Sequence, residues 1–510
     1  MFTLGSQRLN QQNIKSIVYN DELVTIDSEN HRRLAALYEK VKTAAISEKA
    51  YYGINTGFGA LAEQKISQED QNLLQKNIIL SHAVGVGEAL DFATAKAMTL
   101  LRLNTLIQGF SGASPQLIHN LMTLINANIA PLVPHKGSVG ASGDLAPLAH
   151  LGLLLLGLGN CYDRRIMSKS ESALKRCGLN PLELGIRDGL ALINGTQAMA
   201  ASAIISLIEC DKLALLSDIT GACTLEALSG HKTPFDKRIH ELKPHYGQQI
   251  TASNMRTALE GSFVQKHIKN PLTQDPYSLR CIPQVHGASK DVIRHVQEIV
   301  ERELNAVTDN PLIFHDETKD ELSILSGGNF HGQSLALALD YLALAMAELA
   351  NISERRIELL LNDKHSNGLP AFLTPKSGLN SGYMMLHVTA TSLVNENKIL
   401  CHPASVDSIP TSANREDHVS MGMTSANKLR KVIKNTLTVL AIELTASHQA
   451  LGLRPPCTFG QGVQRLHDEL SKIVPLRTCD TLYIDDLSII LEFTQSSQFS
   501  ILINYIFNKK

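Results

Sequence analysis

Apolar residues recur at steps of three and four along most of the chain beyond residue 70, in segments rich in alanine and leucine. This spacing puts the apolar side chains on one face of an α-helix. The pattern predicts helices over residues 68–82, 91–108, 145–157, 197–229, 284–305, 331–362, 380–400, 422–452 and 482–494. Short strands are predicted only near 22–26 and within 311–325, where the chain can form a hairpin.

Several of these helices are longer than the core of a small domain needs. Segments 331–362 and 422–452 would each extend about 45 Å at the rise per residue of an α-helix. Long helices pack as bundles, and alanine-rich faces suit close packing against partner copies. We therefore predict an all-α (mainly α) long-helix bundle with a smaller N-terminal part, divided into residues 1–195 and 196–510, in an oligomer.

Composition narrows the class of ligand. The 510 residues are 44% hydrophobic and 19% charged, as in folded soluble proteins, and the net charge of -2 offers no basic surface for nucleic acid or an acidic membrane. The N-terminus has no signal-peptide pattern, and the apolar stretch 145–159 is too short to span a bilayer. We expect a cytoplasmic protein with a small-molecule ligand and a buried core helix at 145–159.

Signatures of metal and nucleotide sites are missing from the sequence. The eight cysteines are scattered without a CxxC pair, which predicts reduced, structural thiols. Segments 57–62 and 85–90 lack the third glycine of a dinucleotide loop, and there is no GxxxxGK[ST], HExxH or GxSxG motif. We predict chemistry that needs neither a metal nor a nucleotide.

The segment GSVGASGD, residues 137–144, has two interpretations. One is a glycine-rich turn in which Ser142 or Asp144 caps the next helix. The other is chemical: Gly143 has no Cβ, so its amide nitrogen can approach and attack the Ala141 carbonyl. Loss of one water from the ring and a second from the Ser142 hydroxyl would leave an exocyclic methylene conjugated with an imidazolone. That product is an electrophile made from the chain itself.

Six further motifs accompany this one in order: YYGINTGFG, SHAVGVG, DGLALINGTQ, QDPYSLR, SGGNFHGQ and HPASVDSIPTSANREDHVSMG. Together they resemble the family of aromatic amino acid ammonia-lyases and aminomutases that carry the 4-methylidene-imidazol-5-one group, MIO. The resemblance covers nearly the whole chain, and the members that act on histidine match best. It implies that MIO forms autocatalytically from Ala141, Ser142 and Gly143.

The resemblance also implies two active-site tyrosines, Tyr52 and Tyr277. Tyr277 is the family's candidate for the base that takes the β-proton, and Tyr52 would help protonation and positioning. Because a free tyrosine has a pKa of about 10, the base needs nearby positive charge or hydrogen bonds, or must pass its proton on. Apart from the motif, either tyrosine could equally be an amphipathic core residue.

Further residues of the motifs match substrate-binding positions of the family. Arg280 matches the arginine that binds the substrate carboxylate, which suits its planar fork, although it could instead form a surface salt bridge. Asn194 resembles the residue that supports the electrophile and the carboxylate, whereas Asn-Gly alone is commonly a turn. Gln274 and Phe330 would line the same cavity.

Two residues bear on the choice of substrate. His82 lies in a Ser-His-Ala sequence typical of the family members that act on histidine, and Glu416 offers a carboxylate where phenylalanine and tyrosine enzymes carry an NQD-type motif. A carboxylate can accept a hydrogen bond from an imidazole N–H and gains nothing from a phenyl ring. A His and a Glu this far apart in sequence could also have unrelated local roles. Arg415 departs from the family pattern, since histidine enzymes usually have glutamine there.

The resemblance implies elimination of ammonia from L-histidine to give trans-urocanate, the first step of histidine degradation. It also implies a homotetramer with active sites shared between subunits, and no nucleic-acid or membrane partner. Two alternatives remain open at this point. One is a lyase or 2,3-aminomutase acting on tyrosine or phenylalanine, and the other is a non-catalytic helical scaffold.

Overall fold

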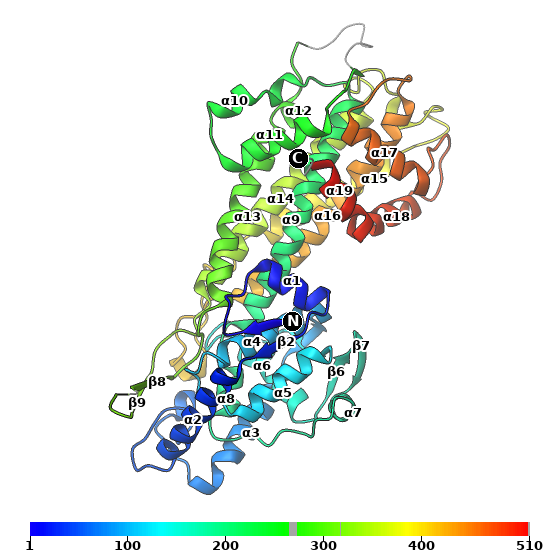
Figure 1. Cartoon of the computed structure of the whole chain (residues 1–510). Helices are drawn as coiled ribbons and strands as arrows, with labels where there is room; N and C mark the ends of the chain where they lie inside the picture. Colours follow the sequence, from blue (N-terminus) through cyan, green and yellow to red (C-terminus); the bar gives the residue numbers. More distant parts are fainter. Residues whose placement is uncertain (265–272, 317, 508–510) are drawn as a thin grey trace. The chain divides into compact units, whose positions relative to one another are not determined.

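The computed structural model describes residues 1–264, 273–316 and 318–507, and most of them are helical (Figure 1). The chain divides into two compact units. Unit 1 comprises residues 1–208, 297–340 and 403–427, and unit 2 comprises residues 209–296, 341–402 and 428–510. Each unit is therefore built from three separate stretches of sequence.

Unit 1 combines short helices with small sheets. Its helices are α1 (Gln11–Tyr19), α2 (Ser28–Ala45), α3 (Gln71–His82), α4 (Phe92–Leu106), α5 (Pro115–Asn126), α6 (Leu145–Leu155), α7 (Ser170–Arg176) and α8 (Asp188–Ile193). Its strands are β1 (Phe2–Leu4), β2 (Val24–Ile26), β3 (Val86–Ala89), β4 (Ile129–Pro131), β5 (Pro134–Lys136), β6 (Asn160–Asp163), β7 (Ile166–Lys169), β8 (Leu312–Asp316) and β9 (Glu321–Leu325). They pair as β1-β2, β3-β5, β4-β6-β7 and β8-β9, and only β1-β2 is parallel.

Unit 2 is helical in its described residues. It contains α10 (Lys237–Glu241), α11 (Tyr246–Ala258), α12 (Tyr277–Arg280), α15 (Met384–Leu400), α17 (Gln461–Ile473), α18 (Tyr483–Gln495) and α19 (Ser497–Phe507). Four long helices have residues in both units: α9 (Gln197–Ala227), α13 (Ile282–Leu304), α14 (Gln333–Leu361) and α16 (Gly422–Leu453).

The predicted all-α long-helix class is confirmed. All nine predicted helices are present with ends within four residues of the prediction, and the predicted hairpin forms as β8-β9, with residue 317 outside the described residues. The apolar stretch after residue 144 is the core helix α6, in which Leu148, Leu151 and Leu155 are fully buried. The pattern did not identify α1, α2, α5, α7, α8, α10, α11, α12, α17 and α19, or the short strands β1 and β3 to β7.

Helix α14 would be long and apolar enough to cross a membrane, but 67% of its most apolar window is buried within the protein. Core helices commonly combine these properties.

Within unit 2, a network of buried charged residues links the four long helices. Arg356 on α14 and the Thr224 hydroxyl on α9 donate to Glu443 on α16, and His286 on α13 bonds to Asp218 on α9.

The ends of three helices prepare a site in unit 1. Helices α3, α6 and α8 pack against one another. His82 is the last residue of α3, Asn194 follows the last residue of α8, and α6 begins two residues after Gly143. Because the three helices pack together, the polar residues at these helix ends lie in one region.

Candidate active site

A cavity of about 500 Å³ lies in unit 1. Its lining comes from five segments of the sequence: 52–66, 74–82, 142–145, 190–194 and 412–416. The cavity brings together five of the side chains singled out from the sequence, namely Tyr52, His82, Ser142, Asn194 and Glu416. Its volume is in the range that holds a small molecule.

The turn that carries Ser142 is held by a contact between two glycines. Gly143 has a φ of +72°, and a Cβ built on it would lie 2.3 Å from the carbonyl oxygen of Gly195. The next residue, Asp144, donates its N–H to that same oxygen at 2.7 Å. A side chain at position 143 would be strained and would collide with backbone, so glycine is required there.

Asp144 stands at the N-cap position of α6, but its side chain makes no capping hydrogen bond. The carboxylate instead accepts from the backbone N–H of Met199, at 2.8 Å, and from the Ser138 hydroxyl, at 3.1 Å. Burial raises the pKa of Asp144 to about 7. The side chain therefore ties the start of α6 to the first turn of α9, which is a different role from simple capping.

Ser142 is joined to the predicted substrate-binding carboxylate. Its hydroxyl donates to Oε1 of Glu416 at 3.0 Å, across 274 residues of sequence. The other oxygen, Oε2, accepts from the hydroxyls of Thr411, at 2.7 Å, and Ser412, at 2.8 Å. Three hydroxyl donors hold this half-buried carboxylate in the cavity wall, and sequence reasoning identified only one of them.

The segment before Glu416 has an unusual backbone. Ser412, Ala413 and Asn414 have φ angles of +49°, +53° and +63°, a left-handed conformation that is costly for residues with a Cβ. Arg415 is exposed, and the described residues include no ion pair between it and Glu416. The arginine that departs from the family pattern therefore leaves the carboxylate free of a cationic partner.

His82 is half-buried at the end of α3, where its Nδ1 lies 2.9 Å from the Ser81 hydroxyl. Burial lowers the pKa of the imidazole, and the charge of Glu416 acts in the opposite direction. With a pKa below 6.5, His82 is mainly neutral at pH 7. His82 and Glu416 line the same cavity.

Two more polar side chains border the cavity. The hydroxyl of Tyr52 accepts the N–H of Gly59 at 3.3 Å. The Asn194 amide is buried and donates through Nδ2 to the carbonyl oxygen of Asn310 at 3.4 Å, while its Oδ1 has no donor among the described residues. An unsatisfied buried acceptor is costly unless a ligand supplies the missing donor.

Comparisons with known proteins show which family the chain belongs to. A model of the aromatic amino acid lyase family matches residues 9–472. The chain belongs to the aromatic amino acid lyases. It is 47% identical over 493 residues to a protein of Sorangium cellulosum named histidine ammonia-lyase, with 96% of both chains covered.

Solved structures of similar proteins have the same fold. A crystal structure of histidine ammonia-lyase from Trypanosoma cruzi is 38% identical, with a TM-score of 0.89, and the match covers 99% of this chain and 95% of that one. A tyrosine aminomutase from Streptomyces globisporus is 31% identical, with a TM-score of 0.93, and covers 100% and 99%.

Four residues that the motifs predicted for the site are not among the described residues that line the cavity. Phe330 is half-buried in a turn of unit 1 that precedes α14. Gln274, Tyr277 and Arg280 belong to unit 2. Tyr277 is 70% exposed on α12, and the Arg280 guanidinium stacks 4.3 Å from the centre of its ring.

Among the described residues, no group of three or more His, Cys, Asp or Glu side chains is arranged to hold a metal ion. None of the eight cysteines forms a disulfide bond within the described residues. Of the three residues predicted to form the electrophile, Ser142 lines the cavity, and its neighbours Ala141 and Gly143 are half-buried and buried.

Proposed function

We propose that this chain converts L-histidine to trans-urocanate and ammonia. The observation that carries the proposal is the carboxylate of Glu416, which lies 3.0 Å from the hydroxyl of Ser142 in the wall of the cavity. A carboxylate there gives an imidazole ring a charged acceptor beside the electrophile-forming serine. The names of the relatives and the structural neighbour from Trypanosoma cruzi support the same substrate.

The residues at the site fit the formation of MIO. Gly143 has the left-handed conformation and the missing Cβ that a closely approaching backbone needs, and Ser142 lines the cavity. Asn194 offers a buried acceptor with no protein donor among the described residues. MIO formed from Ala141, Ser142 and Gly143 would supply an electrophilic methylene that makes the amino group of the substrate a better leaving group.

Glu416 and His82 would hold the imidazole ring. Loss of the Ser142 hydroxyl removes the donor to Oε1 of Glu416 and leaves that oxygen free for an imidazole N–H, while Thr411 and Ser412 keep Oε2 in place. The negative carboxylate stabilises positive charge on the ring. His82, mainly neutral at pH 7, adds a second polar partner without competing for the charge of Glu416.

Tyr52 and Asn194 would act on the amino acid part of the substrate. The Gly59 N–H holds the Tyr52 hydroxyl at the cavity, where it can exchange a proton with the substrate. The free Oδ1 of Asn194 can accept a hydrogen bond from the substrate amino group. Apolar side chains such as Ile78 and Leu190 line the same cavity and reduce its exposure to water.

The remaining residues of the site would come from other subunits of a homotetramer. In this proposal Tyr277 takes the β-proton, Arg280 binds the carboxylate, and Gln274 and Phe330 complete the lining. Helix α14 supports an assembly: Leu337, Tyr341 and Leu344 share one face and are 52%, 47% and 48% exposed in the single chain. An exposed apolar stripe of this kind is typical of a subunit interface.

Incubation of the purified protein with L-histidine tests the function, with the absorbance of urocanate as the signal. L-tyrosine and L-phenylalanine are the matched controls, and mass spectrometry detects any β-amino acid. Formation of coumarate, cinnamate or a β-amino acid without urocanate would contradict the histidine assignment. Intact-chain mass, expected to be lower by two water molecules, tests MIO formation separately.

Mixing of inactive subunits tests the shared sites. Ser142→Ala and Tyr277→Phe chains, each inactive alone, are expected to regain part of the activity when they form hybrid tetramers, since some sites then contain both native residues. Light scattering measures the assembly. A monomer with full activity, or verified hybrids without rescue, would contradict the shared site.

A further inference from the structure

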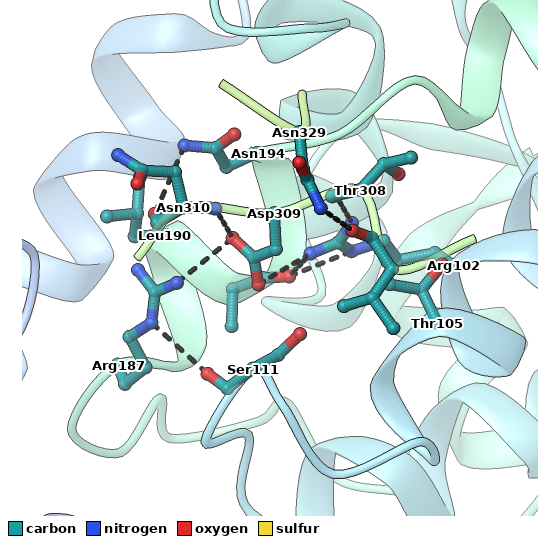
Figure 2. A network of polar contacts seen from close by, with 12 residues as sticks. Arg102, Thr105, Ser111, Arg187, Leu190, Asn194, Thr308, Asp309, Asn310 and Asn329 are labelled. Atoms are coloured by element: carbon teal, nitrogen blue, oxygen red, sulfur yellow. Dashed lines mark hydrogen bonds and ion pairs between the residues drawn. The ribbon is translucent and has the colours of Figure 1, made fainter. Parts of the chain in front are cut away.

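Two fully buried arginines flank one buried carboxylate in unit 1 (Figure 2). Arg187 donates from Nη2 to Oδ1 of Asp309 at 2.9 Å, and Arg102 lies with Nη2 at 3.4 Å from the other oxygen. We call these three residues the arginine clamp. None of the three is among the described residues that line the cavity.

The arginine clamp carries a net positive charge inside the protein. Burial lowers the pKa of Arg102 to about 10, which still leaves it protonated at neutral pH, and Asp309 can balance only one of the two cations. Buried ion pairs contribute little net stability because desolvation opposes the attraction. Stability alone therefore does not explain three buried charges at this position, and the contacts of each arginine indicate another role.

Arg102 holds the segment that ends in the cavity residue Asn194. Its Nε donates to the carbonyl of Ala191 at 2.8 Å, inside α8. Its Nη1 donates to the Gln197 side chain at 3.0 Å and to the carbonyl of Thr308 at 3.2 Å. One guanidinium thus fixes both ends of the turn between α8 and α9 against the segment that contains Asp309.

Arg187 holds the other side of the same segment and reaches the loop of Tyr52. It donates to the carbonyls of Ser111 and Pro311, both at 3.1 Å. A Cβ built on Gly53 would lie 3.1 Å from its Nη1, so the guanidinium packs directly against the residue after Tyr52. Arg187 itself has a φ of +74°, a strained conformation for arginine, which the surrounding contacts maintain.

Asn310 connects Asp309 to the cavity residue Asn194. Its N–H donates to Asp309 Oδ1 at 2.7 Å, and its side chain accepts from the Gly327 N–H at 2.7 Å and the Ser326 hydroxyl at 3.1 Å. The carbonyl oxygen of this fixed residue accepts Nδ2 of Asn194. Because a carbonyl can only accept, it orients the amide so that Oδ1 is the atom left for a ligand (Figure 2).

The same segment sets the position of the electrophile-forming turn. Gly195 follows Asn194 directly, pairs with Gly143 as an isolated bridge, and accepts the N–H of Asp144 at 2.7 Å. A shift of the turn between α8 and α9 would therefore move the Asn194 amide and the Gly143 backbone together.

We propose that the arginine clamp is a positioning device for the reaction. It presents Oδ1 of Asn194 to the substrate amino group and holds Gly195 against Gly143 in the register that the electrophile-forming turn needs. Its members are positioning residues that act through Asn194 and Gly195. The proposal rests on the function proposed above.

A double-mutant cycle tests whether Asp309 acts through Asn194. Asp309→Asn keeps the shape of the side chain and is expected to lower kcat/KM for histidine by about tenfold or more, since small misplacements of positioning groups are costly. When rates are expressed per chain that has lost both waters, which removes any effect on the Gly143 register, the same change in an Asn194→Ala background is expected to cost less than about threefold, because the group it positions is already gone. Arg187→Lys, which keeps the charge but loses the planar fork, repeats the cycle if Asp309→Asn does not fold.

Asp486→Asn is the matched control. Asp486 is a buried aspartate on α18 of unit 2 that accepts two hydrogen bonds from Arg477. This substitution is expected to leave kcat/KM unchanged in the folded protein. If the losses from Asp309→Asn and Asn194→Ala multiply in the double variant, the arginine clamp does not act through Asn194. If the control loses as much activity as Asp309→Asn, the arginine clamp has only a structural role.

Intact-chain mass gives a readout that needs no turnover. Asp309→Asn, unlike Asp486→Asn, is expected to lower the fraction of chains that have lost two water molecules, because the Gly143 register is loosened. If the parent loses both waters but makes no urocanate, the proposed function fails and this comparison alone decides the arginine clamp. A parent that keeps its full mass contradicts both, and an unchanged fraction in Asp309→Asn contradicts the clamp alone.

Discussion

The arginine clamp of unit 1 and the buried charged network of unit 2 use the same kinds of side chain to different ends. In unit 2 the Glu443 carboxylate accepts from Arg356, Ser353 and Thr224, and both ring nitrogens of His286 have partners. Burial lowers the pKa of His286 to about 4, so it links Asp218 and Arg356 as a neutral ring.

Around the arginine clamp, by contrast, the hydrogen bonding is incomplete. Asn194 Oδ1 and Arg187 Nη1 are buried without a partner among the described residues. Native proteins satisfy nearly all buried polar groups, so an acceptor left open beside a cavity indicates capacity for a ligand. The comparison separates a network that only joins helices from one that also serves a site, and the following changes test that separation.

Ser142→Ala has the largest expected effect. The protein is expected to fold, because a methyl group fits where the hydroxyl was, but activity should fall by at least about ten-thousandfold with the electrophile missing. Initial rates with L-histidine measure it, and the intact mass should not show the loss of two water molecules. Turnover near that of the parent would contradict the covalent mechanism.

Glu443→Gln is expected to damage stability and leave the chemistry intact. Removal of the carboxylate leaves Arg356 buried without its counter-charge, which should lower the free energy of unfolding by about 3–5 kcal/mol. Urea denaturation measures the loss, and kcat of the folded protein should stay at the parent value. A selective loss of kcat with unchanged stability would show that the buried charged network around Glu443 also serves the site.

Glu416→Ala is expected to cost about 1.5–3 kcal/mol of transition-state stabilisation, because the imidazole loses a charged acceptor. Values of kcat/KM give this figure directly. Glu416→Gln, which keeps an acceptor without the charge, should lie between the parent and the alanine variant. Equal kinetics for all three proteins would mean that the ring binds elsewhere.

A smaller effect is expected from the protonation of His82. Because burial lowers its pKa from the ordinary value, the imidazole is mainly neutral at neutral pH and gains a proton as the pH falls into the acidic range. A charged His82 would compete for Glu416, so the ratio of kcat/KM between the parent and His82→Gln should be constant at neutral and alkaline pH and fall at acidic pH. The ratio cancels the titration of the substrate itself, and a ratio independent of pH would exclude this role.

Arg415→Gln is expected to change least. The side chain is exposed and has no ion pair with Glu416 among the described residues, so restoring the glutamine usual in histidine enzymes should alter kcat/KM by less than about 0.5 kcal/mol. A larger gain in activity would show that Arg415 weakens the carboxylate in solution.

The sequence pattern predicted the long helices because their apolar periodicity persists over many turns. It did not identify α2, where only five of eighteen residues are buried and polar residues interrupt the apolar stripe. The strands β3 to β7 are three or four residues long, too short for an alternating pattern to distinguish them from turns.

The residues of the site were also predicted only in part from the sequence. Family motifs singled out Ser142 and Glu416, and the hydroxyls of Thr411 and Ser412 are close enough in sequence to Glu416 to have been suspected. Arg102 and Asp309 are 207 residues apart and belong to no motif with a known chemical role. Only the tertiary fold brings such residues together, so single-sequence reasoning has no signal for the arginine clamp.

The hydrogen bond between Ser142 and Glu416 also has a consequence for synthesis of the chain. At about 5–20 residues per second, a ribosome needs roughly 14–55 s to make the 274 residues that separate them. The turn that carries Ser142 therefore leaves the ribosome long before its acidic partner exists. The cavity wall is complete only after 416 of the 510 residues have been translated, so maturation of the site is a late event in the life of the nascent chain.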